Sequence, residues 1–276
     1  MEPDTIQVEI EETTLTVEDG FAFQQNAFRE FRNLFSLAKE KHHWYFASAL
    51  APDSRKTKDP DWDVSIGIAE AFNDYDQWIR MNVLYPNPFR SINIRIALGF
   101  YCHLAEASSF YVVPKNMMRI IEGEAAMINP FFHLYRKRKN GENIPPNANA
   151  VIIDLHAHAK RLKLDNLADV FAGAFNPDMR NGFAHGDYLI RHDGIHFPNQ
   201  LKRPVRISPN QFYLWLNRAV NFFQCIRSVI IENSQAYVTP QTFVQEFEGV
   251  PWECTVFIDE ARDVMSLNAV KSVQQL

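Results

Sequence analysis

Residues 176–188 read NPDMRNGFAHGDY and describe a short helix whose two ends are both marked in the sequence. Asparagine is a preferred N-cap, proline is favoured at the first helical position, and an acidic residue in the first turn complements the helix dipole. Gly186 is typical of a helix end, because glycine readily adopts the left-handed conformation found there. The stretch therefore predicts a helix from Pro177 to His185.

Apolar residues on both sides of this helix recur at the three- and four-residue spacing of amphipathic helices. The helices that we expect span residues 21–50, 63–85, 89–111, 114–126, 130–139, 151–162, 165–175 and 209–232. Pro114 begins one of them, because proline suits the first helical position. The expected fold class is therefore mostly α, a bundle of helices.

Strand-like alternation interrupts the helical pattern. Residues 188–197 read as a β-hairpin with an Asp-Gly turn at Asp193-Gly194, and a second apolar run at 205–207 extends it. Residues 5–17 read as another short hairpin. The tail combines a strand near 254–258 with a short final helix. Small β elements are therefore expected beside the helices.

The segment 51–62 contains two prolines and many charges, which makes it the best linker candidate in the chain. We accordingly expect an N-terminal extension at residues 1–60, a helical domain at 61–235 and a C-terminal extension at 236–276. The helical domain carries the small β-hairpin insertion, and both extensions are short and of mixed α/β character.

The composition is that of a soluble globular chain, with 46% hydrophobic and 22% charged residues among 276. Three cysteines, far apart and without a CxxC pair, exclude a disulfide framework and a cysteine-based zinc site, and they suit a reducing compartment. The N-terminus is acidic where a secretion signal would be basic and then apolar, and no run approaches a membrane span. We expect a cytoplasmic protein that uses no membrane, metal or cofactor.

The formal net charge of -5 is unevenly distributed. Seven acidic and no basic residues precede Phe21, and residues 246–263 hold six acidic residues and one basic residue. Residues 130–206 reverse this balance, with twelve basic against seven acidic residues. An evenly acidic chain would repel nucleic acid. Because residues 130–206 are basic, RNA remains an expected partner. The alternative interpretation is that these charges form a solvated face without a ligand.

Arg180 and His185 are the sharpest candidates for chemistry. An arginine is always charged and its forked donors suit phosphate, whereas a histidine exchanges protons near neutral pH. The same spacing recurs at Arg191 and His196 in the expected hairpin, so spacing alone carries little weight. The helical context and the polar Asn181 directly after the arginine distinguish the first pair. The chain has no P-loop, GxGxxG, GxSxG or HExxH motif.

The run RNGFAH at residues 180–185 resembles the motif of the HEPN superfamily, in which an arginine is followed by a polar residue and a histidine comes after four to six intervening positions. The resemblance covers residues 62–233 in general plan. It implies a helical bundle that dimerises and, as in many members, acts as a metal-independent endoribonuclease. Such proteins occur in toxin–antitoxin pairs, abortive-infection proteins and RNA-guided CRISPR effectors.

The same resemblance implies that Arg180 and His185 are catalytic, with Asn181 as the orienting residue and Asp187 in support. It also implies a cognate antitoxin or regulatory protein as a partner. Some toxins of the superfamily carry a modified tyrosine two residues after the histidine. Because Asp187 holds that position here, that regulation is not carried over.

RNA cleavage without a metal uses the ribose 2′-OH as nucleophile, so His185 would move protons and Arg180 would stabilise the added negative charge. Five positions along a helix rotate by about 500°, which leaves the two side chains about 140° apart. A composite site at the seam of a two-fold homodimer is therefore expected. The alternative is that Arg180 pairs with Asp178 or Asp187 in a non-catalytic module that dimerises or binds a nucleotide or a partner.

Basic runs near the motif are candidates for RNA binding. The residues concerned are Arg136, Lys137, Arg138, Lys139, Lys202 and Arg203. A single strand or loop is the expected substrate, because unstacked nucleotides can adopt the in-line geometry of cleavage. Phe131, Phe132 and Tyr135 lie beside the first run and either stack on bases or pack in the core. His156 and His158 are expected on a polar helix face with Asp154, pointing in different directions.

Overall fold

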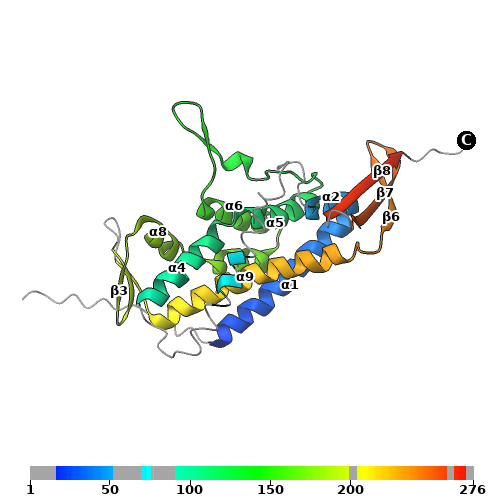
Figure 1. Cartoon of the computed structure of the whole chain (residues 1–276). Helices are drawn as coiled ribbons and strands as arrows, with labels where there is room; N and C mark the ends of the chain where they lie inside the picture. The colour runs from blue at the N-terminus through cyan, green and yellow to red at the C-terminus, as the bar shows by residue number, and fades with distance from the viewer. Residues whose placement is uncertain are drawn as a thin grey trace, which may run out of the picture.

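The computed structural model describes residues 17–51, 70–71, 73–75, 77, 91–198, 204–259 and 264–271. This part of the chain is mostly helical, and three small antiparallel sheets are attached to the helical body (Figure 1). Most of the hairpin expected at 5–17, of the linker expected at 51–62 and of the helix expected at 63–85 lies outside the described residues.

The helices follow the predicted order. They are α1 (Val17–Lys41), α2 (His43–Leu50), α4 (Ser91–Glu106), α5 (Ser108–Ile121), α6 (Ala148–Arg161), α7 (Asp165–Ala174), α8 (Pro177–His185) and α9 (Pro209–Gln235). The bounds predicted for α8 are confirmed. The single helix expected over 21–50 is instead split at His42, whose φ of -159° leaves the helical region. The Nδ1 atom of His42 then caps α2 by accepting a hydrogen bond from the backbone N–H of Tyr45 at 3.2 Å.

Aromatic side chains fill the centre of the bundle, where α1 and α9 run side by side (Figure 1). Phe31 of α1 meets Phe171 of α7 and Phe222 of α9 edge to face, at ring-centroid distances of 5.9 and 5.6 Å. All three rings are fully buried. Edge-to-face pairs stabilise a core beyond the apolar area they bury. Aromatic residues of α1, α7 and α9 therefore meet in the centre of the core.

Pro114 does not begin a helix, so that prediction was wrong. It lies inside α5, which starts six residues earlier at Ser108. The break between α4 and α5 falls at Ala107, where the buried hydroxyl of Tyr111 donates to the carbonyls of Leu104 and Ala105 at 3.1 and 3.2 Å. Tertiary packing thus sets this boundary, and it tolerates a proline that removes one helical hydrogen bond.

The helix expected at 130–139 is also wrong. After a single 3-10 turn at Phe132–Leu134, the chain forms a two-stranded antiparallel hairpin, β1 (Arg136–Lys137) with β2 (Asn143–Ile144). Gly141, with φ +84°, closes the turn by donating its N–H to the carbonyl of Arg138 at 2.9 Å. Residues 132–144, here called the basic arm, project from the helical body as the green hairpin at the top of Figure 1.

The expected hairpin after α8 is confirmed. It comprises β3 (Leu189–Arg191) and β4 (Gly194–Phe197), and β5 (Val205–Ile207) adds the third strand in the order β3-β4-β5. Arg191 pairs with Gly194, so the loop residues are His192 and Asp193 rather than the Asp-Gly pair. Phe197 is buried against the helical body, which ties the sheet to α8.

The tail is an antiparallel meander, and the short final helix expected there is wrong for its described part. Its strands are β6 (Gln241–Phe247), β7 (Val250–Asp259) and β8 (Val264–Lys271), at the right of Figure 1. The meander reaches α2 through aromatic contacts, since His43 stacks on Phe243 with ring centroids 4.1 Å apart. In its described part, the C-terminal extension consists of strands joined by turns and contains no helix. The strand β8 pairs with β7 along its whole length, in the region where the final helix was expected.

One helical stretch among the described residues, Ser91–Ile121, is long and apolar enough to cross a membrane, which corrects the expectation that no run approaches that length. Half of its apolar window is buried inside the protein. The stretch also breaks at Ala107 into α4 and α5. It is therefore compatible with core helices of a soluble protein.

Candidate functional site

The helix α8 is held at both ends by the residues that mark it in the sequence. The side chain of Asn176 accepts hydrogen bonds from the backbone N–H groups of Asp178 and Met179, at 3.0 and 3.1 Å. At the other end, Gly186 has φ +71° and donates to the carbonyl of Phe183, and Asp187 donates to that of Gly182. These two bonds form a Schellman motif. Both ends of this short helix are thus satisfied by local hydrogen bonds.

One face of α8 packs tightly on the body. Gly182 faces the ring of Phe197 so closely that a Cβ atom there would lie 2.1 Å from its Cδ1. The neighbouring residue Phe183 packs on α4, where its ring lies beside Gly99. These close approaches orient the remaining faces of the helix and therefore direct Arg180 towards α4.

Arg180 lies at the centre of a polar network that joins three helices. Its Nε and Nη2 both donate to Oε1 of Glu106 on α4, and its Nη1 donates to Oδ1 of Asn181 at 2.9 Å. The same Oδ1 accepts a weaker bond from Nδ2 of Asn149 on α6, at 3.4 Å. The Arg180 side chain is 13% exposed and that of Glu106 is 44% exposed. The network therefore reaches the surface through Glu106.

Neither Asp178 nor Asp187 is the ion-pair partner of Arg180, so the pairing expected in the non-catalytic alternative was wrong. Glu106 takes their place because α4 passes directly beside α8. The orienting role expected of Asn181 has a matching contact, since its amide oxygen fixes one arm of the guanidinium.

His185 and Asp187 lie apart from this network. Both are exposed at the end of α8, and Asp187 contributes its backbone N–H to the helix cap. Within the described part of the chain, the His185 side chain makes no hydrogen bond or ion pair. One protomer therefore does not bring Arg180 and His185 into contact, as the rotation along the helix predicts.

Cys102 lies under Arg180, and its thiol is 3.8 Å from the Arg180 carbonyl oxygen. Burial raises the pKa of this thiol to about 12, with the Glu106 carboxylate adding to the rise and the Arg180 charge opposing it. A thiol with that pKa stays protonated at neutral pH, and the thiolate is the reactive form. Cys102 is therefore a packing residue.

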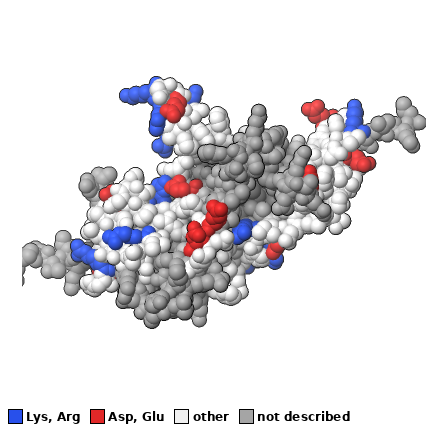
Figure 2. Space-filling view, in the orientation of Figure 1, with Lys and Arg blue, Asp and Glu red and all other residues white. Residues whose placement is uncertain are grey.

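The predicted basic residues fall in different places. Arg136, Lys137, Arg138 and Lys139 are all exposed on the basic arm, where Figure 2 shows blue side chains gathered at the top of the view. Arg138 pairs with Glu142 at 3.0 Å. Lys202 and Arg203 lie outside the described residues. Phe131 is buried, so the core-packing alternative is confirmed for this ring, whereas Phe132 is exposed and Tyr135 is half-buried.

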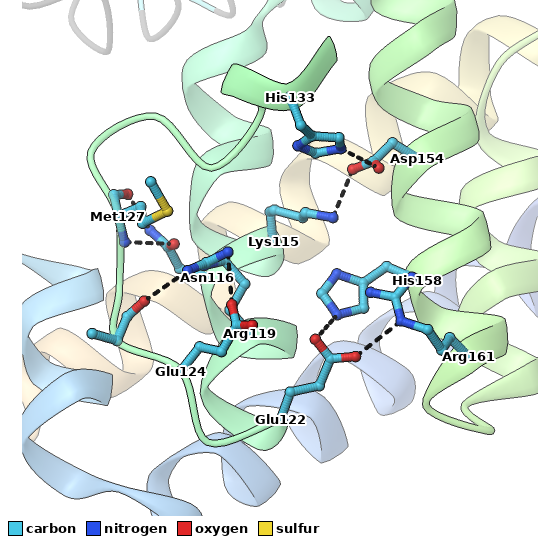
Figure 3. Close-up of polar contacts among 11 residues, drawn as sticks. Lys115, Asn116, Arg119, Glu122, Glu124, Met127, His133, Asp154, His158 and Arg161 are labelled. Carbon is cyan, nitrogen blue, oxygen red and sulfur yellow. Dashed lines mark hydrogen bonds and ion pairs between the residues drawn. The ribbon is translucent and has the colours of Figure 1, made fainter.

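A second polar cluster, not found from the sequence, joins α5, the 3-10 turn and α6 (Figure 3). The buried ammonium of Lys115 lies 2.7 Å from Oδ2 of Asp154, and Nε2 of His133 lies 2.8 Å from Oδ1 of the same carboxylate. His158 is only 1% exposed and lies 3.1 Å from Glu122, so its expected place on a polar face was wrong. Helical periodicity in the sequence predicts only a helix at 151–162 and gives no signal that one of its histidines is buried.

Burial lowers the pKa of His158 to about 4, together with the nearby Lys115 charge and against the opposing effect of Glu122. His158 is therefore neutral at physiological pH and acts as a structural residue. Among the described residues, no group of three or more His, Cys, Asp or Glu side chains is placed to hold a metal ion.

No model of a known protein family matches the chain, and neither a curated protein nor a solved structure matches it. The function proposed below therefore rests on the geometry around α8 and on the motif that this helix carries.

Proposed function

We propose that the chain is a metal-independent endoribonuclease of the HEPN type, with its site on α8. The observation that supports this proposal is the hydrogen bond from Arg180 to the adjacent Asn181, on a rigidly capped helix that presents His185 at its exposed end. The arginine is thus oriented by its polar neighbour, and the histidine is accessible to a substrate.

In the proposed reaction, the ribose 2′-oxygen attacks the adjacent phosphorus, the O2′–P bond forms and the P–O5′ bond breaks. His185 accepts the 2′-OH proton, and the imidazolium so formed gives up that proton, through water, to the departing 5′-oxygen. Arg180 stabilises the extra negative charge of the phosphorane. The products are a 2′,3′-cyclic phosphate and a 5′-hydroxyl, and no metal or cofactor takes part in these steps.

Because Arg180 and His185 do not meet within one protomer, we place the complete site at the seam of a homodimer. Ile92 and Ile96 are exposed one turn apart on α4, the helix that packs against α8. A second copy that covered these apolar side chains would bring two α8 helices towards one cleft. Arg180 of one protomer and His185 of the other would then face a single phosphate.

The second candidate is a non-catalytic HEPN-like module that dimerises or binds a nucleotide or a partner. The observation that favours it is the ion pair of Arg180 with Glu106, since a carboxylate already occupies the guanidinium. Under either function we place the protein in the cytoplasm. A role as toxin or anti-phage effector, restrained by a cognate antitoxin, belongs to the first candidate.

The test is incubation of the purified chain with end-labelled single-stranded RNA in EDTA, beside DNA of the same sequence. The nuclease function predicts RNA fragments with 2′,3′-cyclic phosphate ends and intact DNA, because DNA lacks the nucleophile. Intact RNA at every protein concentration, with a dimer seen by sedimentation, would favour the non-catalytic module.

A further inference from the structure

The basic arm is the most strongly charged projection among the described residues. It holds four consecutive basic residues, 136–139, and one acidic residue, Glu142. All five side chains are exposed, and Glu142 forms an ion pair with Arg138 and accepts a hydrogen bond from the side chain of Asn140. Arg136, Lys137 and Lys139 therefore present a net positive surface to solvent, clear of the helical body (Figures 1 and 2).

An aromatic pair, of which Phe132 is exposed and Tyr135 is half-buried, lies at the base of the basic arm. Phe132 is 62% exposed, and its ring lies 5.6 Å from that of Tyr135 with an interplanar angle of 30°. The hydroxyl of Tyr135 accepts a hydrogen bond from the side chain of Asn129 at 3.1 Å. Tyr135 is thus fixed, and Phe132 offers one open ring face beside the basic run. An aromatic ring next to exposed cations is the arrangement on which unpaired bases stack.

The base of the basic arm is tied to the bundle at two points (Figure 3). Asn116 of α5 makes two hydrogen bonds with the backbone of Met127, at 2.8 and 3.0 Å. Asp154 of α6 contacts both the buried Lys115 and His133 of the 3-10 turn. The aromatic pair therefore sits on a rigid support, and little ordering entropy is lost when a ligand binds it.

The return strand of the basic arm leads directly to the candidate site. Five residues after β2, Asn149 in the first turn of α6 donates to Oδ1 of Asn181, the atom that orients Arg180. The basic arm is thus joined to the surroundings of Arg180 through the first turn of α6.

We propose that the basic arm binds one strand of RNA, stacks a base on Phe132 and leads the strand to Arg180. The identity of the strand as substrate rests on the proposed function. Charge complementarity favours a polyanion, and the open aromatic face favours unpaired bases over a duplex, whose bases are already stacked. An acidic protein could pair with the basic side chains but has no base to stack on the ring of Phe132, so RNA fits the arm better.

The test is binding of the full-length protein to a labelled single strand with 2′-O-methyl riboses, which lacks the nucleophile and so separates binding from cleavage. The variants are Phe132→Ala and the pair Lys137→Gln with Lys139→Gln. Phe21→Ala is the matched aromatic control, because Phe21 is also 62% exposed and lies on α1, away from the basic arm. Lys41→Gln with Lys271→Gln is the matched charge control, since both lysines are exposed.

We expect Phe132→Ala to weaken binding about tenfold, as for loss of one stacked base. The lysine pair should reduce the slope of log affinity against log salt by about 1.4, because each phosphate that is no longer neutralised accounts for about 0.7. Neither control should change binding by more than about twofold. All variants should melt like the wild type, because the replaced side chains are exposed.

Equal binding by both arm variants and their controls would overturn the proposal, as would failure of the wild type to bind the strand. Binding of a poly-glutamate peptide as tight as that of the strand would also overturn RNA as the occupant. Arm-dependent binding without any cleavage of unmodified RNA would sustain this proposal and remove the proposed nuclease function. Cleavage that depends on His185 and is equally fast in the wild type and the arm variants would support the nuclease function and overturn the role proposed for the basic arm.

Discussion

The amide oxygen of Asn181 accepts a hydrogen bond from Nη1 of Arg180 at 2.9 Å and so fixes the plane of the guanidinium. Because the two residues are adjacent on a capped helix, this contact does not depend on a distant loop. Glu106 holds the other edge of the same guanidinium. The arginine is consequently oriented before any substrate arrives.

Asn181→Ala should lower the cleavage rate without weakening RNA binding. A hydrogen bond to a charged group contributes about 1.5 kcal/mol or more, which corresponds to roughly a tenfold loss in kcat at unchanged KM. Asn181→Asp retains an acceptor oxygen and should restore most of the kcat that Asn181→Ala loses, although its carboxylate, like that of Glu106, opposes the phosphate and raises KM. A rise in KM alone, or no rescue by aspartate, would show that Asn181 serves only the fold.

Glu106→Gln should tighten RNA binding. The carboxylate of Glu106 opposes an incoming phosphate at Arg180, and an exposed pair of this kind contributes about 1 kcal/mol or less to stability. We expect roughly threefold tighter binding at low salt and a Tm within about 4 °C of the wild type. Weaker RNA binding by Glu106→Gln would mean that the Glu106 carboxylate aids binding by orienting the guanidinium, and does not oppose the phosphate.

Gly182→Ala should destabilise the protein by about 1–3 kcal/mol, because the new methyl group overlaps the buried Phe197 ring. Gly99→Ala is the control on the neighbouring helix. Its Cβ would meet the nearest atom, Cζ of Phe183, at 3.7 Å, an ordinary contact. Alanine there should stabilise α4 by about 0.5–1 kcal/mol. Urea unfolding of the two variants checks both signs, and equal effects would contradict the packing described for α8.

His158 should make stability depend on pH in mildly acidic solution. The folded-state pKa of about 4 lies below the ordinary value of 6.5, so the unfolded chain binds the proton more readily. The contribution is present above pH 6.5 and is lost as the pH falls towards 4. Between pH 7 and pH 5 the free energy of unfolding should drop by about 2 kcal/mol from this group.

Urea unfolding at both pH values measures this drop. His158→Gln should abolish most of it, whereas His103→Gln, at an exposed position on α4, should leave it intact. An equal pH dependence in the wild type and His158→Gln would show that His158 is not the group responsible.

The sequence was sufficient for elements whose ends carry local signals. Asn176, Pro177 and Gly186 define α8, and Ser208 defines the start of α9 through a capping box with Gln211. It failed where tertiary contacts override a local preference. Pro114 lies inside α5 because Tyr111 fixes the preceding turn, and no local pattern reports that contact.

The basic arm shows a different reason for failure. Its strands are two residues long, which is too short to show the alternation of apolar and polar residues typical of a strand. The dipeptide Asn140-Gly141 was the one local sequence signal for a hairpin turn. For the site, the sequence identified Arg180, Asn181 and His185 as candidates, but neither the ion pair of Arg180 with Glu106 nor the contact of Asn149 with Asn181. Glu106 and Asn149 come from other helices, 74 and 32 residues away in sequence from the residues they contact.

The rate at which 2′,3′-cyclic phosphate ends appear from single-stranded RNA in EDTA tests the central claim most directly. The variants are Arg180→Gln and His185→Gln, with Arg191→Gln and His196→Gln as controls of identical spacing on the β3–β4 hairpin. The account predicts at least about a hundredfold loss in the first two and rates within about twofold of the wild type in the controls. Undiminished cleavage by Arg180→Gln or His185→Gln, or no cleavage by the wild type, would contradict it.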